Sequence, residues 1–188
     1  KGVSPEVHCD EIAEKYIETW AKLNISYDSF IRTTEEKHKE AVKKIFIRLQ
    51  EQGDIYKKSY QGLYCFGCEA FYLEKDLDEK GLCPDHKRAP ELVSEENYFF
   101  KITKYKQKIK EHIINNPGFI QPESRKNEVL NLLEDFEDIS VSRETVKWGI
   151  KVPGDDKQVI YVWLDALNNY ITALGFESND DSNFKKFW

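Results

Sequence analysis

The chain has 188 residues, of which 40% are hydrophobic, 13% aromatic and 33% charged, so it can form a core and is not intrinsically disordered. Its longest apolar runs are only a few residues, which excludes a transmembrane helix, and its first residues lack the apolar stretch of a secretory signal. The formal net charge of −6 provides no global positive field that would attract nucleic acid or a membrane. We therefore expect a cytoplasmic protein with no membrane partner, in which any contact with nucleic acid is local.

Two amphipathic helices are predicted before residue 54. Ser4 and Pro5 combine an N-cap with a proline at the first helical position, and apolar residues at helical spacing continue to about Leu23. After a connector, residues 33–36 (T-T-E-E) resemble a capping box for a second helix, which Gly53 ends. The apolar stripe of this second helix consists of Ala41, Val42, Ile45, Phe46 and Leu49.

The middle of the chain changes to short aromatic and β-branched runs that are typical of strands. Two helices are predicted after them, one capped by Thr103 and ended by Asn116, the other opened by Pro122. The other predicted elements are, in chain order, strands at 55–56, 60–64 and 71–72, a charged loop over 74–88, a strand at 97–102, an extended segment at 139–143 and a turn at 153–156.

Near the end, residues 159–164 form a continuous apolar run, as expected of a strand that is buried on both faces of a parallel sheet. Asp165 follows directly and is a good N-cap for a helix that runs through Tyr170 to Gly175. A strand, a short turn and a helix form half of a βαβ unit. This pattern indicates the α/β class, with the partner strands elsewhere in the chain or outside this sequence.

Three cysteines and one histidine have the ligand type and spacing of a tetrahedral zinc site. Two knuckles each present two ligands, and we expect Gly67 to relieve the tight turn of the first. Thiolate ligands favour zinc, iron or Cu(I) over magnesium or calcium, although a rubredoxin-like iron centre would want a fourth cysteine. Four protein ligands leave no open position for a substrate, so the zinc would be structural. The predicted ligands are Cys65, Cys68, Cys83 and His86.

Other interpretations of the same residues stay open at this point. Without a metal, the three cysteines would be small buried hydrophobic residues and His86 a surface residue. With a metal, the chain could be a zinc-ribbon module that binds nucleic acid or protein, or a redox or metal-sensing protein. Lysines at 101, 104, 106, 108 and 110 form a local basic stretch, but their spacing scatters them around a helix and favours a solvated face.

Motifs spread along the chain resemble those of one enzyme family. Residues 161–170 are similar to the signature Y-V-W-[FL]-D-A-[LP]-x-x-Y, and residues 142–155 are similar to an S-R…W-G-x-x-x-P block. Residues 30–34, 96–100 and 121–125 match the same family. Over nearly its whole length, the chain is thus similar to methionyl-tRNA synthetases, which are class I aminoacyl-tRNA synthetases.

This resemblance implies an α/β fold in which a partial Rossmann-type catalytic domain is interrupted by an α+β zinc-knuckle insertion. Residues 1–53 would be a helical segment associated with the Rossmann domain, residues 54–157 the zinc-binding connective-peptide insertion, and residues 158–188 the return to the Rossmann domain. The family uses ATP and Mg²⁺ to convert L-methionine into methionyl-adenylate, and then transfers the methionyl group to tRNA(Met). The first step is an in-line attack of the carboxylate on the α-phosphorus, which positioning and charge stabilisation accelerate.

The resemblance also implies roles for single residues. Trp163 and Tyr170 would be walls of the methionine side-chain pocket, with Ala166 leaving room beside them, because a thioether gains from contact with aromatic faces. Arg143 would be a catalytic arginine that meets carboxylate or phosphate oxygens bidentately. From the residues alone, the two rings would be interpreted as core residues, and Arg143 could be an ordinary surface ion-pair residue.

Two motifs of the family, H-I-G-H and K-M-S-K-S, do not occur in these 188 residues. In the family the first cradles ATP at a strand-to-helix turn and the second carries a lysine on a loop. We therefore expect an internal fragment that does not catalyse adenylation alone, because the nucleotide phosphates have no cradle.

Overall fold

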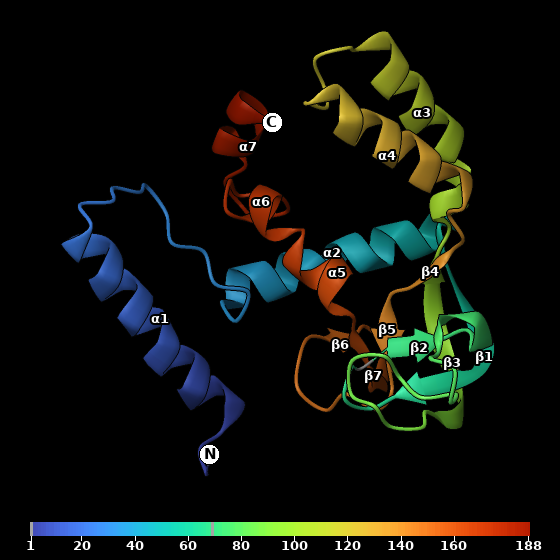
Figure 1. Ribbon diagram of the computed structural model, residues 1–188. Helices are drawn as coiled ribbons and strands as arrows, with labels where there is room; N and C mark the ends of the chain where they lie inside the picture. The colour runs from blue at the N-terminus through green and yellow to red at the C-terminus, as the bar shows by residue number, and fades with distance from the viewer. Residues whose placement is uncertain (1, 69) are drawn as a thin grey trace. The chain divides into compact units, whose positions relative to one another are not determined.

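A computed structural model describes residues 2–68 and 70–188 (Figure 1). Contacts divide the chain into two compact units, the first formed by residues 1–52 and 145–188 and the second by residues 53–144. Residues 145–157, which the sequence grouped with the metal-binding segment, thus belong to the first unit. Within the described residues, every helix is too short or too polar to cross a membrane.

The first unit is a mixture of helices and a short antiparallel β-pair. It contains α1 (Pro5–Lys22), α2 (Glu36–Glu51), β6 (Lys151–Val152), β7 (Asp155–Ile160), α5 (Val162–Ala166), α6 (Asn169–Thr172) and α7 (Ser182–Phe187).

The first two helices confirm most of the predicted start and stop signals. The Ser4 side chain caps α1 by accepting a hydrogen bond from the backbone N–H of Val7 at 3.3 Å. Gly53 follows the end of α2 with a φ of +71°, a conformation that favours glycine. The predicted capping box is wrong in its hydroxyl half. The N-cap of α2 is Glu35, whose carboxylate accepts from the backbone N–H of Arg32 at 3.0 Å.

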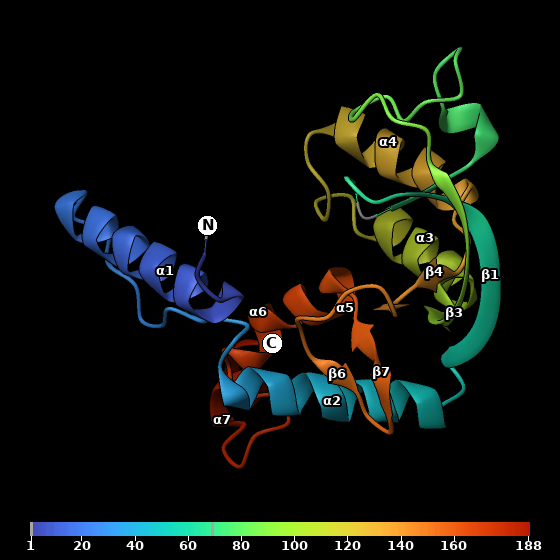
Figure 2. The same ribbon diagram turned by 90° about the horizontal axis from the view of Figure 1, so that it is seen from below.

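The core of the first unit lies along α2. This helix contacts α5, α6 and β6, and both ribbon views show the two short helices close to it (Figures 1 and 2). The predicted apolar stripe faces this core, because residues at spacings of three and four share one side of a helix. The buried apolar side chains of the unit are Ala41, Val42, Ile45, Phe46, Ile150, Val152, Val159 and Ile160.

The predicted strand at 159–164 is wrong in its second half. The strand β7 pairs antiparallel with β6 and ends at Ile160, and Tyr161 is the N-cap of α5. Asp165 consequently lies inside α5 instead of capping it, and the expected single helix is divided into α5 and α6. A short apolar run cannot distinguish a buried strand from a helix by periodicity. Here the backbone N–H of Leu164 bonds to the carbonyl of Tyr161 at 3.0 Å and so begins a helical turn.

The second unit is built on a four-stranded antiparallel sheet with strand order β2-β1-β3-β4. Its elements are β1 (Ile55–Cys65), β2 (Ala70–Tyr72), the 3₁₀ helix η1 (Glu74–Asp76), β3 (Glu91–Phe100), the 3₁₀ helix η2 (Ile102–Tyr105), α3 (Lys106–Asn115), α4 (Glu123–Glu134), β4 (Ile139–Ser140) and β5 (Ser142–Arg143).

The strands β1 and β3 form a long hairpin, drawn in green in Figure 1, whose register runs from Ile55 opposite Phe100 to Tyr64 opposite Glu91. The sequence predicts two short strands in place of β1, because polar residues interrupt the apolar pattern at Lys57 and Lys58. The ladder continues through them, since backbone pairing does not require apolar side chains. The ammonium groups of Lys57 and Lys58 also lie over the rings of Tyr98 and Phe99 in β3, so the aliphatic parts of the lysine side chains cover these rings.

The two predicted helices of this unit are confirmed as α3 and α4, which pack against each other (Figure 1). Pro122 is the N-cap of α4, as expected, and Asn116 ends α3. The predicted cap of α3 is wrong, because a turn of 3₁₀ helix precedes it. The Thr103 hydroxyl instead donates to Asp138 Oδ1 at 2.7 Å.

Asp54 lies at the base of the β1–β3 pair, and its carboxyl group should make the stability of the second unit depend on pH. Its buried carboxylate accepts from Lys104 Nζ and from the Tyr105 hydroxyl, each at 2.5 Å, and its backbone carbonyl accepts from the N–H of Lys101 at 2.8 Å. The hydrogen bond from Lys104, followed by that from Tyr105, lowers the pKa of this carboxyl below its ordinary value.

A carboxyl with a lowered pKa contributes stability above its unfolded pKa, near 3.9, and the contribution is lost as the pH falls through the folded pKa. We expect Asp54→Asn to lower the Tm at pH 7 and the difference from wild type to shrink as the pH falls below about 3.9 and through the lowered pKa of Asp54. Thermal unfolding between pH 2.5 and 7 measures this effect. Asp76→Asn, an exposed position of the same unit, is the control and should follow wild type throughout.

Candidate functional site

The four predicted metal ligands converge in the second unit, and their donor atoms all lie within 4.8 Å of one another. Cys68 Sγ lies 3.1 Å from His86 Nδ1 and 3.4 Å from Cys83 Sγ, and Cys65 Sγ lies 4.0 Å from His86 Nδ1. A tetrahedral ion with bonds of about 2.3 Å to sulfur separates two sulfur ligands by about 3.8 Å. The donors are thus spaced to hold one zinc ion, with Nδ1 as the atom that His86 would offer.

Two backbone turns bring these ligands together. Cys65 ends β1, and Cys68 lies in the turn that leads to β2. Around Cys83 the chain folds back, because its N–H donates to the Arg88 carbonyl at 2.9 Å and its carbonyl accepts from the N–H of Lys87 at 2.8 Å. Cys65 and Cys83 are buried, whereas the other two ligands face the surface, so the cluster is half-buried.

Gly67 is required for a more specific reason than the turn itself. A Cβ atom at this position would lie 2.6 Å from Cδ2 of the His86 ring, closer than any real contact. The ligand ring therefore packs directly on the glycine backbone. A side chain at residue 67 would push the imidazole away from the three sulfur atoms.

Two polar residues that the sequence analysis did not identify lie beside the cluster. The Tyr72 hydroxyl is 3.1 Å from Cys68 Sγ and 3.2 Å from Asp85 Oδ2, within hydrogen-bonding distance of both. Asp85 lies inside the second knuckle, and Tyr72 ends β2. The available signal was that Asp85 lies between the predicted ligands Cys83 and His86, whereas nothing in the spacing of the ligands indicates Tyr72.

Burial and hydrogen bonds shift the pKa values of two thiols of the cluster in opposite directions. Burial opposes ionisation of Cys83, but the backbone N–H groups of His86 and Asp85 and the Tyr72 hydroxyl lower its pKa to about 6. At Cys68 the hydrogen bond from Tyr72 favours the thiolate, yet burial and the neighbouring sulfur atoms raise its pKa to about 11. Thiolates are the zinc ligands, so metal binding at neutral pH would displace a proton from Cys68.

Arg143 lies in β5 and is 6% exposed. Its Nη1 atom donates to Ser140 Oγ and to the Ser142 carbonyl, both at 2.7 Å. The interpretation of Arg143 as an ordinary surface ion-pair residue is therefore wrong. Its catalytic role stays a prediction.

Trp163 and Tyr170 lie on α5 and α6 of the first unit and are 58% and 64% exposed. The interpretation of these rings as core residues is therefore wrong, since both present large aromatic faces at the surface of their unit. Between the two helices, the Asn168 side chain donates to the Leu164 carbonyl at 2.5 Å and shapes the turn after Ala166. The role of these residues in a methionine pocket stays a prediction.

A buried polar group connects this segment to α2, and the sequence analysis missed it. His38 is completely buried, with Nε2 at 2.8 Å from Asp165 Oδ1 and Nδ1 at 2.8 Å from Thr172 Oγ1. The available signal was its position in α2. His38 precedes Ala41 and Val42 by three and four residues and therefore continues the apolar stripe.

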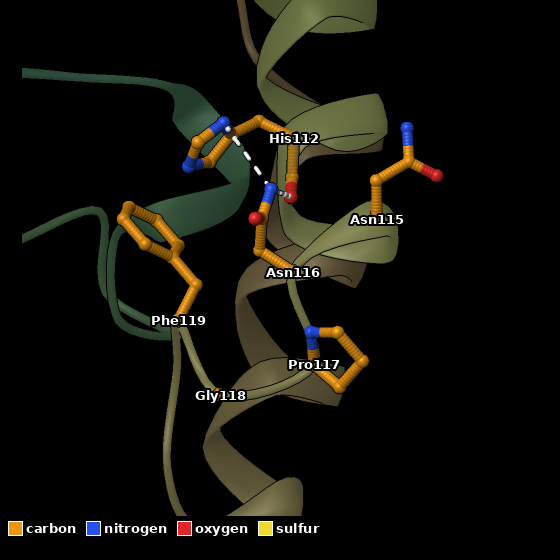
Figure 3. A pocket seen from close by; sticks show the side chains of 6 residues that line it. All are labelled: His112, Asn115, Asn116, Pro117, Gly118 and Phe119. Atoms are coloured by element: carbon orange, nitrogen blue, oxygen red, sulfur yellow. Dashed lines mark hydrogen bonds between the residues drawn. The ribbon is translucent and has the colours of Figure 1, made fainter.

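An open hollow of about 480 Å³ lies where α3 ends (Figure 3). The rings of His112 and Phe119 meet edge to face there, with centroids 4.6 Å apart, and the Asn116 side chain donates to the His112 carbonyl at 2.7 Å. None of the predicted site residues lines it. The lining residues are His112, Asn115, Asn116, Pro117, Gly118 and Phe119.

Comparison with protein families identifies the chain. The profile of one family, described as tRNA synthetases class I (M), matches residues 1–90 and 83–188. The chain belongs to this family. The resemblance of its motifs to class I aminoacyl-tRNA synthetases is thereby confirmed.

Curated members of the family match over the whole chain. A methionine–tRNA ligase of Caldanaerobacter subterraneus subsp. tengcongensis is 52% identical over 100% of this chain and 30% of its own length. A methionine–tRNA ligase of Clostridium perfringens is likewise 52% identical, over 29% of its length. The chain therefore spans about 30% of the curated relatives that it matches.

Solved structures agree with this assignment. Methionyl-tRNA synthetase of Mycobacterium tuberculosis in complex with methionyl-adenylate matches 100% of this chain and 38% of its own, with a TM-score of 0.88 and 36% identity. The apo form of that synthetase has a TM-score of 0.84. The mixed α/β fold of the chain is thus similar to that of methionyl-tRNA synthetase.

Proposed function

We propose that this chain is part of a methionine–tRNA ligase, which uses ATP and Mg²⁺ to activate L-methionine as methionyl-adenylate and transfers the methionyl group to tRNA(Met). The observation that carries the proposal is 52% identity over the whole chain to methionine–tRNA ligases. The bound methionyl-adenylate of a structural neighbour supports the same chemistry.

In this proposal, residues 1–53 and 158–188 contribute to a Rossmann-type catalytic domain, and residues 54–157 form its connective-peptide insertion, of which residues 145–157 pack within the first unit. Trp163 and Tyr170 line the methionine side-chain pocket, and Ala166 leaves room beside them. Their exposure supports this role, because an aromatic surface without a covering partner is available to a thioether. Arg143 contacts a carboxylate or phosphate oxygen through its guanidinium group.

The Cys65–Cys68–Cys83–His86 cluster holds a structural zinc ion. All four donors are protein atoms, which leaves no coordination position for a substrate, and their mutual distances fit a tetrahedral ion. Bound zinc would cross-link the two knuckles that follow β1. The chain's own contribution is to present one imidazole and three sulfur atoms with the correct spacing.

The zinc-ribbon alternative finds no support in the basic stretch at 101–110. Lys104 pairs with Asp54 at 2.5 Å and Lys110 pairs with the Glu134 carboxylate, so acidic partners neutralise these two charges. Lys106 donates to the backbone carbonyl of Glu134 and is held within the same unit. A phosphate-binding surface needs uncompensated cations. This stretch therefore stabilises the second unit.

Methionine-dependent exchange of pyrophosphate into ATP tests the proposed function. We expect activity from the full-length protein that contains this chain, and none above background from a polypeptide of these 188 residues, which lack the H-I-G-H and K-M-S-K-S motifs. Isoleucine and valine in place of methionine are the controls. An inactive full-length protein would refute the proposed function, and an active 188-residue polypeptide would refute the proposed dependence on these motifs.

A further inference from the structure

We propose that His38 is a positioning residue, which fixes the two short helices that carry the predicted methionine pocket. The identity of the pocket rests on the proposed function. We call the contacts of His38 with Asp165 and Thr172 the clamp. The evidence for the clamp is the geometry of α2, α5 and α6, all of which belong to the first unit.

Residues 162–172, which include α5 and α6, are called the pocket segment here. The imidazole of His38 contacts this segment near both of its ends. Its Nε2 atom is 2.8 Å from Asp165 Oδ1 on α5, and its Nδ1 atom is 2.8 Å from Thr172 Oγ1 on α6. Ala166 and Tyr170 lie between these two attachment points, and Trp163 precedes the first by two residues. A shift of this one ring would therefore move every residue of the predicted pocket.

The pocket segment depends on such contacts because its helices are short. α5 has five residues and α6 has four, far fewer than the roughly 12 to 15 that an isolated helix needs for marginal stability in water. The Asn168 side chain donates to the Leu164 carbonyl within the segment and shapes its turn. Attachment to the longer α2 must come from tertiary contacts, of which the two hydrogen bonds of His38 are directional and originate from a fully buried ring.

The donors and acceptors of the clamp match when His38 is neutral with its proton on Nε2. An ionised Asp165 carboxylate can only accept, so Nε2 donates to it. Nδ1 then accepts from the Thr172 hydroxyl. The other possible acceptor of that hydroxyl, the Asn169 carbonyl, is more distant at 3.5 Å. Each polar atom of the clamp is thus satisfied in one tautomer, which fixes the ring orientation.

A hydroxyl, an imidazole and a carboxylate in this order also occur in hydrolase triads. Burial argues against such chemistry here. Thr172 is 4% exposed and His38 is fully buried, so no substrate carbonyl reaches the hydroxyl. The three residues accordingly act through the helices that they connect.

The test uses the full-length protein with His38→Gln, Thr172→Val and Thr172→Ser. A glutamine amide cannot span two partners on opposite sides of a ring, and valine removes the hydroxyl at nearly constant shape. Because one lost hydrogen bond corresponds to roughly a tenfold change, we expect His38→Gln and Thr172→Val to raise the KM for methionine about tenfold. The KM for ATP should stay within about twofold, and Thr172→Ser should restore methionine binding.

Hydrogen exchange provides a second readout that does not depend on activity. His38→Gln and Thr172→Val should accelerate amide exchange over residues 162–172 and leave α1 unchanged. Val42→Ala is the matched control, because Val42 is equally buried on the same helix and lacks a polar link to the pocket segment. It should lower Tm without raising the KM for methionine.

The outcomes separate the two proposals. If the wild-type protein shows no methionine-dependent exchange, the proposed function fails, and amide exchange over 162–172 still decides the clamp. An unchanged KM for methionine in both variants of an active enzyme overturns the positioning role. An equal rise in Val42→Ala overturns it as well, since the effect would then follow from general destabilisation.

Discussion

Replacing Cys83 with serine is expected to abolish zinc binding. Cys83 is fully buried, which opposes ionisation, but hydrogen bonds from the backbone N–H groups of His86 and Asp85 lower the pKa of its thiol to about 6, so its thiolate is available to a cation at neutral pH. A serine hydroxyl stays protonated and is a poor zinc ligand. Removing a residue that only hydrogen-bonds to a metal ligand typically lowers metal affinity by about 10- to 100-fold. We therefore expect removal of the ligand itself to lower zinc affinity by more than about 100-fold.

Mass spectrometry of the full-length protein under native and denaturing conditions measures this loss directly. Wild type should retain zinc that Cys83→Ser lacks, and the variant should unfold at a lower temperature, because metal binding and folding are coupled. Cys9→Ser is the matched control, since Cys9 lies on α1, outside the cluster. Equal zinc content in wild type and Cys83→Ser would remove Cys83 from the proposed site.

Truncating Trp163 to alanine is expected to reduce kcat/KM for methionine by about 30- to 1,000-fold. Aromatic anchors of binding sites typically contribute about 2 to 4 kcal/mol, and each 1.4 kcal/mol corresponds to a factor of ten. The ring is 58% exposed in its unit, so its removal should leave the Tm nearly unchanged. Pyrophosphate exchange at varied methionine concentration, together with thermal unfolding, separates these two effects.

Two matched variants sharpen this test. Val162→Ala truncates the neighbouring residue, which is 52% exposed and has no predicted role, and should retain wild-type kinetics. Trp163→Phe keeps an aromatic face for the thioether and should lose less activity than Trp163→Ala. A loss of similar size in Val162→Ala would show that the proposed pocket is misplaced on α5.

Local signals in the sequence predicted most of the helices and the metal cluster. Ser4 and Pro5 determine the start of α1 through neighbouring backbone groups, so no tertiary information is needed. Similarly, the spacing of Cys65 and Cys68 places two sulfur atoms on one turn, whatever surrounds them. The predicted roles of Arg143 and Trp163, in contrast, came from a family resemblance and not from any local rule.

The features that sequence reasoning missed depend on contacts between distant residues. His38 meets Asp165 and Thr172 more than 120 residues later, and nothing near His38 in the chain specifies these partners. The strand predicted at 159–164 failed for a related reason. Its six apolar residues suit a strand or a helix equally, and the chain turns into α5 where its pairing with β6 has ended.

The long ladder between β1 and β3 separates the metal cluster from the opposite end of the second unit. Asp54 and Lys101 close that end through a backbone hydrogen bond, and the β1 residues that pair with β3 all precede Cys65. Insertions or deletions among residues 73–90, outside β2, therefore leave the pairing of β1 with β3 unchanged, because the chain leaves and re-enters this ladder at the same rung, Tyr64 opposite Glu91. The length of this loop can therefore change without disturbing the backbone pairing of Asp54 with Lys101 at the other end of the ladder.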